Sequence, residues 1–202
     1  MTVGIYVLAA GRGKRFGGPK LDAPCAGRPL GAWALRAIED AAVAPGLLIV
    51  PPVVPRFAEE ARARGWMLAR NGNADRGLST SLALAIRNAE RAGHRAACIF
   101  LADMPLIGER HIRSIVSAGS PDQSVATLYP DRRLGVPARF PRALFPTLAT
   151  MPSGGGASAL LADQSTLVIM TDFGNLHDVD DRTGLSHGET ILQERERAAA
   201  LA

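Results

Sequence analysis

The apolar residues of this chain fall into two recurring patterns. Continuous runs rich in β-branched and other apolar residues occupy 3–9, 46–54, 66–70 and 96–101. Runs of this kind, bounded by glycine or proline, are typical of strands buried on both faces of a parallel sheet. Stripes of apolar residues with helical spacing occupy 29–44, 55–65 and 77–93. Strands and helices therefore alternate, which predicts an α/β domain with a mostly parallel sheet and right-handed crossovers.

The pattern is less regular in the second half of the chain. A helix is predicted over 109–119, and two strand-like segments, 124–130 and 134–140, are separated by the short polar turn 131–133. Such a pair predicts a hairpin added to the main sheet. A further strand, 166–171, and a charged helix at the C-terminal end complete the order. We expect one Rossmann-like, three-layer domain over residues 1–202, because no linker divides the chain.

Composition narrows the class of protein. The 202 residues are 47% apolar and 21% charged, as in an ordinary water-soluble domain. The net charge is +4, but the arginines are scattered among acids with few aromatic residues between them, so we expect no nucleic-acid partner. No apolar run is long enough for a bilayer span, and we expect no membrane partner. With only two cysteines, Cys25 and Cys98, the cytoplasm is the expected location.

The segment after the first strand, "VLAAGRGKRFGGPK" at 7–20, combines glycines with positive charge. Glycines allow the backbone N–H groups to approach an anion closely, and basic side chains add full charges. The combination favours a polyphosphate ligand; the alternative is a tight turn with exposed basic residues. The spacing fits neither the Walker loop nor the G-x-G-x-x-G dinucleotide fingerprint. The residues concerned are Gly11, Gly13, Gly17, Gly18, Lys14, Arg15 and Lys20.

Asp103 follows another buried strand, in the sequence "FLADMP". Ligands of parallel sheets bind beyond the carboxyl ends of the strands, so this carboxylate is expected near the glycine-rich loop. A carboxylate facing bound phosphates needs a cation between them, and Mg²⁺ is the natural choice. In "HDVDD", Asp178 and Asp180 alternate onto one face, and either could complete the metal site. The alternatives are that Asp103 caps a turn and that the acidic run is a solvated loop.

Several of these segments together resemble one family. The string Leu8-Ala9-Ala10-Gly11, followed by Arg15-Phe16-Gly17 and Lys20, is similar to the L-A-A-G-x-x-x-R-[MF]-G-x-x-K signature of nucleotidyltransferases, in particular the MobA-like group. Further similarities follow in order and cover nearly the whole chain: "GLSTSL" at 77–82, "LADMP" at 101–105, "GVPARFPRALFPTL" at 135–148 and "DVDDRTGL" at 178–185. Ala10, where guanylyl-transferring members usually carry glycine, resembles the branch of molybdenum cofactor cytidylyltransferases.

The resemblance implies a fold of the nucleotide-diphospho-sugar transferase type and a role for each matching residue. Arg15, Lys20 and Asp103 would be catalytic, and Asp103 would hold Mg²⁺ with Asp178 or Asp180. Ser79 and Ser81 would offer hydroxyls to cytosine, unless they simply cap the helix that begins there. The implied nucleotide-binding residues are Leu8, Ala9, Ala10, Gly11, Gly13, Gly17, Gly77, Ser79 and Ser81.

The implied activity is transfer of CMP from CTP to the terminal phosphate of molybdopterin, with a molybdoenzyme as the eventual recipient of the cofactor. One stretch departs from the family pattern. Where molybdopterin-binding members commonly carry G-D-x-G-A-R, this chain has Gly154 in place of the aspartate and Ser158 in place of the arginine. Two alternatives therefore stay open: transfer to a sugar phosphate or another phosphorylated alcohol, and a non-catalytic accessory protein that binds the nucleotide or cofactor.

Overall fold

A computed structural model describes residues 3–11, 13, 15–152 and 157–201. Lys14 and residues 153–156, which include Gly154, lie outside these described residues. Within the described ranges, no helix is both long enough and apolar enough to span a bilayer.

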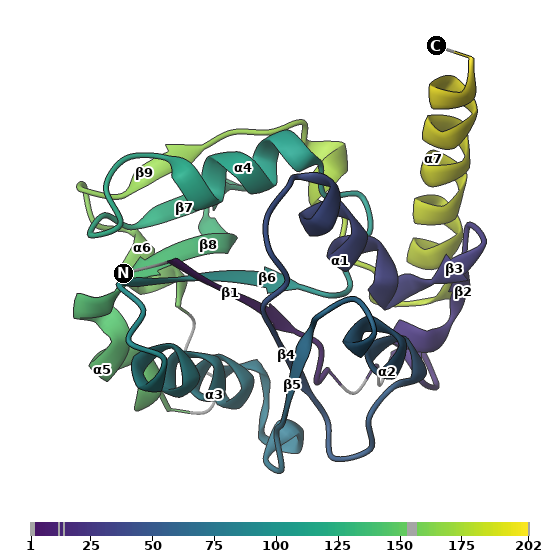
Figure 1. Cartoon of the computed structure of the whole chain (residues 1–202). Coiled ribbons are helices and arrows are strands. Elements are labelled where there is room, and N and C mark those ends of the chain that lie inside the picture. Colours follow the sequence, from purple (N-terminus) through teal and green to yellow (C-terminus); the bar gives the residue numbers. More distant parts are fainter. Residues whose placement is uncertain (1–2, 12, 14, 153–156, 202) are drawn as a thin grey trace.

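A single mixed sheet forms the middle layer of the structure (Figure 1). In the described part of the chain its strand order is β5-β4-β1-β6-β8-β7-β9. The strands are β1 (Val3–Leu8), β4 (Leu47–Val50), β5 (Met67–Arg70), β6 (Ala96–Leu101), β7 (Val125–Leu128), β8 (Leu134–Pro141) and β9 (Leu167–Ile169). Only β8 runs antiparallel to its neighbours, which confirms both the mostly parallel sheet and the predicted hairpin.

Helices cover both faces of this sheet (Figure 1). The first face carries α1 (Leu30–Asp40), α2 (Arg56–Arg62) and α4 (Glu109–Ser117), and the second carries α3 (Leu78–Arg91), α5 (Phe145–Ala149) and α6 (Ser158–Leu161). Short 3-10 turns lie at η1 (Lys20–Asp22), η2 (Ala74–Arg76), η3 (Arg142–Leu144) and η4 (Phe173–Leu176). The predicted three-layer α/β architecture is therefore confirmed.

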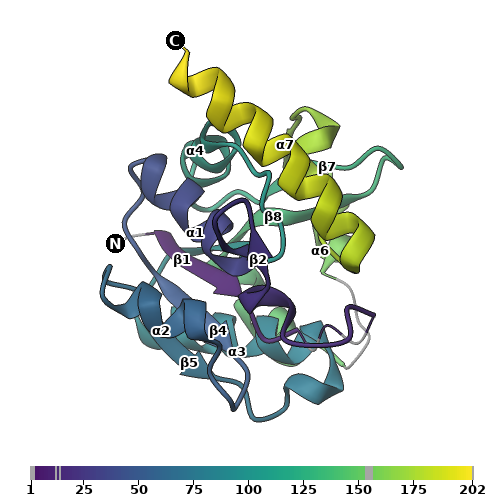
Figure 2. The same cartoon turned by 90° about the vertical axis from the view of Figure 1, so that its right-hand side faces the viewer.

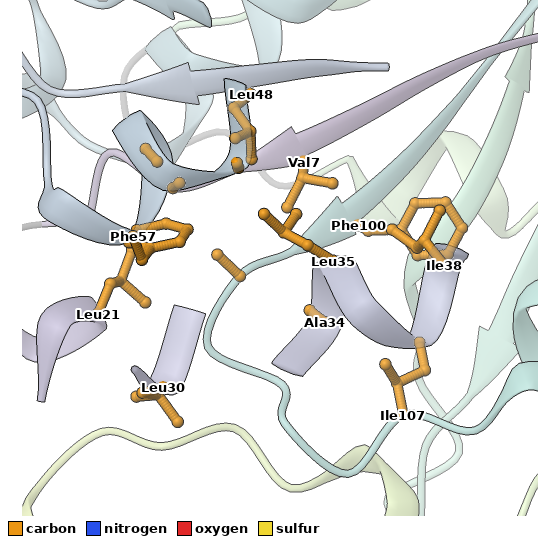
Figure 3. Close-up of a cluster of buried hydrophobic side chains, with 14 of the residues drawn as sticks. Val7, Leu21, Leu30, Ala34, Leu35, Ile38, Leu48, Phe57, Phe100 and Ile107 are labelled. Atoms are coloured by element: carbon orange, nitrogen blue, oxygen red, sulfur yellow. The ribbon is translucent and has the colours of Figure 1, made fainter. Parts of the chain in front are cut away.

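The alternation of side chains along β1 explains the two cores. Ile5 and Val7 point into the cluster with α1 and α2, which Figure 3 shows around Leu35 and Phe57. Tyr6 and Leu8 point into the opposite cluster, with α3 and α5. Burial of one large apolar side chain contributes roughly 1.5–3 kcal/mol, so a strand buried on both faces is held strongly in register. The loop after β1 is therefore anchored at a rigid point.

Two further elements complete the fold: a short ladder that was not predicted, and the C-terminal helix, which was predicted without exact bounds. A two-residue ladder joins β2 (Pro24–Cys25) to β3 (Arg28–Pro29). The C-terminal helix α7 (Arg182–Ala200) packs against β2, and Figure 2 shows it crossing that side of the molecule. The carboxylate of Glu189 in α7 accepts a hydrogen bond from the Ala26 N–H at 2.8 Å. The start of α7 is thereby tied to the segment that follows the glycine-rich loop.

The parallel strands direct their carboxyl ends to one edge of the sheet. The segments that follow β1, β5 and β6 leave the sheet there, and the Ala102 N–H still donates to the Leu8 carbonyl at 3.1 Å. The Val179 N–H donates to the Asp103 carbonyl at 2.9 Å, so the acidic stretch 177–181 reaches the same edge. This convergence is what the sequence predicts for a ligand site in a parallel sheet.

Candidate active site

The glycine-rich loop folds back on itself directly after β1. The N–H groups of Phe16 and Gly17 both donate to the Gly13 carbonyl, at 2.9 and 3.1 Å. Gly13 has φ +55°, and a Cβ added there would lie 3.0 Å from the Cβ of Lys20. A side chain at this position would therefore crowd Lys20 as well as strain the backbone. Glycine at position 13 lets the loop close tightly enough to bring Lys20 against the sheet.

Lys20 is buried, with 7% of its surface exposed, and its ammonium makes two hydrogen bonds at the sheet edge. Nζ donates to Asp103 Oδ2 at 2.7 Å and to the Val179 carbonyl at 2.6 Å. An ammonium carries three N–H donors, so one is left for a ligand in the adjoining cavity. Lys20 thus joins the glycine-rich loop, the end of β6 and the acidic stretch in one charged cluster.

The acidic stretch presents its two predicted metal ligands on either side of buried Val179. Asp180 Oδ2 lies 2.8 Å from an Nη of Arg15, and both side chains are largely exposed, at 41% and 75%. The guanidinium of Arg182 stacks 4.5 Å from the centre of the Phe16 ring, which adds a second contact between the same two segments. Arg15 therefore lines the cavity and contacts the acidic stretch at the same time.

These residues line one cavity of about 460 Å³. It brings together nine of the residues that the sequence singled out: Ala10, Gly11, Gly13, Arg15, Lys20, Gly77, Ser81, Asp103 and Asp180. Leu78, within the predicted helix start at 77–81, lines it as well, and so do Ala74 and Asp75, which were not predicted. Only the position of Ala74 and Asp75 in the sequence could have indicated them, because they follow β5 at the same edge of the sheet.

The remaining predicted residues lie around this cavity. Leu8 and Ser79 line a neighbouring, more apolar cavity of about 330 Å³, together with Tyr129 and Ser158. Ala9 lines a third, of about 320 Å³, behind the loop. Gly17 closes the turn on Gly13.

Ser79 and Ser81, two residues apart on the first turn of α3, point to different cavities. The N-cap of α3 is Gly77, and no side-chain hydrogen bond caps the helix within the described residues. Neither serine is therefore the helix cap. Ser81 accepts a hydrogen bond from Asn71 Nδ2 at 3.0 Å, whereas the buried Ser79 hydroxyl has no partner among the described groups.

Tyr129, at the end of β7, lies between the second cavity and the acids. Burial, together with the negative charges of Asp178 and Asp103, raises its pKa to about 12. The phenol is therefore neutral at physiological pH, and its O–H donates to the Val136 carbonyl. Nothing in the sequence marked Tyr129, because a tyrosine at a strand end is common.

The described residues contain no group of three His, Cys, Asp or Glu side chains arranged to hold a metal ion. Asp103 and Asp180 nevertheless line the same cavity. Two hard oxygen donors fit a magnesium-type ion that takes its other ligands from phosphate oxygens and water. The donor set thus suits a cation that arrives with a polyphosphate better than one held by protein alone.

The fold and this cavity define a protein of the nucleotidyltransferase type. A family model described as the MobA-like NTP transferase domain matches residues 5–167, and the chain belongs to that family. The match spans the glycine-rich loop, the start of α3 and Asp103, and ends before the acidic stretch 177–181.

Individual relatives are more distant. The chain is 25% identical over 197 residues to the purine catabolism protein PucB of Bacillus subtilis, covering 88% of this chain and 91% of that protein. A nucleotidyl transferase from Methanothermobacter has a similar structure, with a TM-score of 0.82, 17% identity and coverage of 96% and 99% of the two chains. Rv0371c from Mycobacterium tuberculosis also has a similar structure, with a TM-score of 0.78, 22% identity and coverage of 94% of this chain and 98% of that one. Rv0371c has also been solved as a complex with manganese.

Proposed function

We propose that this protein is a Mg²⁺-dependent cytidylyltransferase that transfers CMP from CTP to the terminal phosphate of molybdopterin or its metal-bearing form. The observation that carries the proposal is the convergence of Gly11, Gly13, Lys20 and Asp103 on one cavity. Membership of the MobA-like NTP transferase family supports nucleotidyl transfer as the reaction type. CTP is favoured over other nucleotides by Ala10, the residue that resembles the cytidylyl-transferring branch.

In this proposal the triphosphate lies against the loop after β1. The backbone N–H groups around Gly11 and Gly13 donate to its oxygens, and Arg15 and the third N–H of Lys20 neutralise its charge. The base extends toward the start of α3, where Ser81 lines the cavity. Ser79 lines the neighbouring cavity, so Ser81 is the better placed of the two hydroxyls to face the base in this proposal.

Asp103 would hold Mg²⁺ together with Asp180 or Asp178. Asp180 is the better placed of the pair, because it lines the same cavity as Asp103. When bound, the ion supplies charge neutralisation on phosphate oxygens. Lys20 is hydrogen-bonded to both the Asp103 carboxylate and the Val179 backbone. In this proposal it therefore fixes the position of Asp103 relative to Asp180, the residue after Val179.

The proposed reaction needs no protein nucleophile. An oxygen of the acceptor phosphate attacks the α-phosphorus of CTP, a new P–O–P bond forms, and the bond to pyrophosphate breaks in line with it. The acceptor phosphate is already ionised near neutral pH, so no general base is required. Arg15 and Lys20 reduce the repulsion between the two anions and stabilise the departing pyrophosphate. The chain's contribution is therefore positioning and positive charge.

One observation favours a second candidate acceptor. Ser158, where the family commonly has arginine, lines the neighbouring cavity, so this position supplies no charge to pair with a pterin phosphate, and Arg133, which lines the same cavity, is paired with Asp131. A sugar phosphate or another phosphorylated alcohol would need less from this position. If the acceptor is molybdopterin, a molybdoenzyme in the cytoplasm is the expected recipient of the product.

The experiment is pyrophosphate release from CTP, GTP and UTP, each with Mg²⁺ and either molybdopterin or a panel of sugar phosphates. Release that requires both CTP and molybdopterin supports the proposal. Release that requires a sugar phosphate supports the second candidate. A protein that binds CTP but releases no pyrophosphate with any acceptor is an accessory binder, and the proposal fails.

A further inference from the structure

The side-chain amide of Asn71 lies beneath the start of α3. Asn71 follows β5, its own N–H donates to the Val50 carbonyl at 2.7 Å, and only 4% of its surface is exposed. No motif in the sequence marks this asparagine. Asn71 does not line the 460 Å³ cavity, but it contacts Ser81, which does.

The orientation of this amide follows from its neighbours. The Asn73 N–H donates to the amide at 3.0 Å, and because a backbone N–H only donates, the atom facing it is Oδ1. Nδ2 therefore faces the two hydroxyls of α3, donating to Thr80 Oγ1 at 2.9 Å and to Ser81 Oγ at 3.0 Å. Both N–H donors and the carbonyl of the buried amide are thus used, and it has no low-energy alternative orientation.

The two hydroxyls differ in what they do with their own protons. Thr80 Oγ1 lies 2.8 Å from the Gly77 carbonyl and 2.9 Å from the Asn73 carbonyl, so its proton is taken up within the turn. Ser81 receives a hydrogen bond from Asn71 and donates to no described group. Its proton is left for the cavity that it lines.

We propose that Asn71 is a positioning residue that fixes Ser81 as a hydrogen-bond donor to the nucleotide. This inference rests on the proposed function. It adds that the edge of the base facing α3 carries a hydrogen-bond acceptor, as the O2 and N3 edge of cytosine does. Asn71 acts through Ser81 and does not itself touch the ligand.

The test exchanges the amide for an isosteric acceptor. In Asn71→Asp, the carboxylate accepts from Ser81 and turns that proton away from the cavity. We expect the Kd of CTP, measured by calorimetry, to rise about tenfold, the size of one lost hydrogen bond. KM should rise with kcat nearly unchanged, because the contact is made equally in ground and transition states.

Three matched variants separate positioning from general damage. Ser81→Ala should weaken CTP binding similarly, and Asn71→Asp should have no further effect in the Ser81→Ala background. Thr80→Val removes the other hydroxyl bonded to the same amide and should leave the Kd within about twofold. If Asn71→Asp does not fold, Asn71→Ala replaces it. The Kd of CTP should then rise about threefold, because the Ser81 hydroxyl loses its partner but its proton is not turned away from the cavity.

The outcomes are distinguishable from failure of the proposed function. The nucleotide used is whichever of CTP, GTP and UTP the wild type binds most tightly; if it binds none, the proposed function itself is overturned. If the wild type binds nucleotide but the Asn71 variants match it while Ser81→Ala weakens binding, Asn71 does not set the serine. If Ser81→Ala binds as the wild type does, the serine does not contact the base.

Discussion

Lys20 Nζ lies 2.7 Å from Asp103 Oδ2, and the same ammonium is 2.6 Å from the Val179 carbonyl. The first residue comes from the glycine-rich loop, the second from the end of a central strand and the third from the acidic stretch before α7. One buried lysine thus determines where the carboxylate stands relative to the loop.

Replacing Asp103 by asparagine should remove activity while leaving the fold intact. The amide keeps the size of the side chain and can still accept from Lys20, but it loses the charge that would hold a divalent ion. We expect kcat to fall by at least about a hundredfold. Pyrophosphate release measures the first effect, and thermal unfolding measures the second.

The matched control is Asp163→Asn. Asp163 is exposed, accepts hydrogen bonds from Ser165 and lies outside the cavity. The Asp163→Asn variant should release pyrophosphate at the same rate as the wild type. Equal activity of Asp103→Asn and the wild type would remove Asp103 from the catalytic site.

Lys20→Met should lower both activity and stability. The substitution leaves the Asp103 carboxylate and the Val179 carbonyl without their common donor in a largely buried place. Loss of such a charged hydrogen bond costs about 1–3 kcal/mol, or a fall in Tm of several degrees. An unchanged Tm would show that Lys20 does not hold the three segments together.

Arg15→Ala should weaken nucleotide binding with almost no change in stability. The Arg15–Asp180 pair is largely exposed, and such pairs contribute less than about 1 kcal/mol. In the proposed function the triphosphate competes with Asp180 for this guanidinium, and removal of the Arg15 side chain also frees Asp180. We expect a higher Kd for CTP and tighter binding of Mn²⁺ in the absence of nucleotide, both measurable by calorimetry.

Arg36→Ala is the control for this prediction. Arg36 makes a similar exposed ion pair with Asp40, at 2.8 Å, on α1 and away from the cavity. It should change neither affinity. If Arg15→Ala also left both affinities unchanged, the guanidinium would have no part in binding triphosphate.

The two thiols predict how stability depends on pH. Burial raises the pKa of Cys98 to about 12, and burial together with Glu189 raises that of Cys25 to about 11. An unfolded chain ionises its thiols near pH 8.5, so above that value the unfolded state loses protons first and is favoured. The stability contribution of the neutral thiols is complete below about pH 8.5 and declines toward the folded-state values.

Urea midpoints at about pH 7.5 and about pH 9.5 test this dependence. The wild type should lose stability between them, and a variant with both cysteines replaced by alanine should lose less. A midpoint in the wild type that rises over this range would contradict the assignment of both thiols as buried and neutral. The same protection predicts slow reaction of either cysteine with a thiol reagent until the protein unfolds.

Much of the fold was predictable because its strands are buried on both faces. Continuous apolar runs mark β1, β4 and β6, and the period of α1 and α3 follows from one apolar stripe each. The two-residue β2–β3 ladder was not predictable, because so short a pairing leaves no periodic signal. The ends of the helices also differ from those predicted. The apolar stripe at 29–44 corresponds to a helix that ends at Asp40, because Ala42 adopts φ +57°, outside the helical region.

The candidate site was predictable in outline for a different reason. Glycines and charges at strand ends mark Gly13, Lys20 and Asp103, and parallel topology brings them together. The orientation of the side chains on α3 was not predictable. The sequence predicts that Ser79 and Ser81 both face the base, but their spacing on the helix places them in the linings of different cavities. Asn71 and Tyr129 were missed, because their roles depend on contacts between segments distant in sequence.

The most direct test of the account is the mass of the acceptor after incubation with CTP, Mg²⁺ and molybdopterin. The account predicts an acceptor that gains one CMP with the wild type and stays unmodified with Asp103→Asn. An unmodified acceptor with the wild type, under conditions in which it binds CTP, would contradict it.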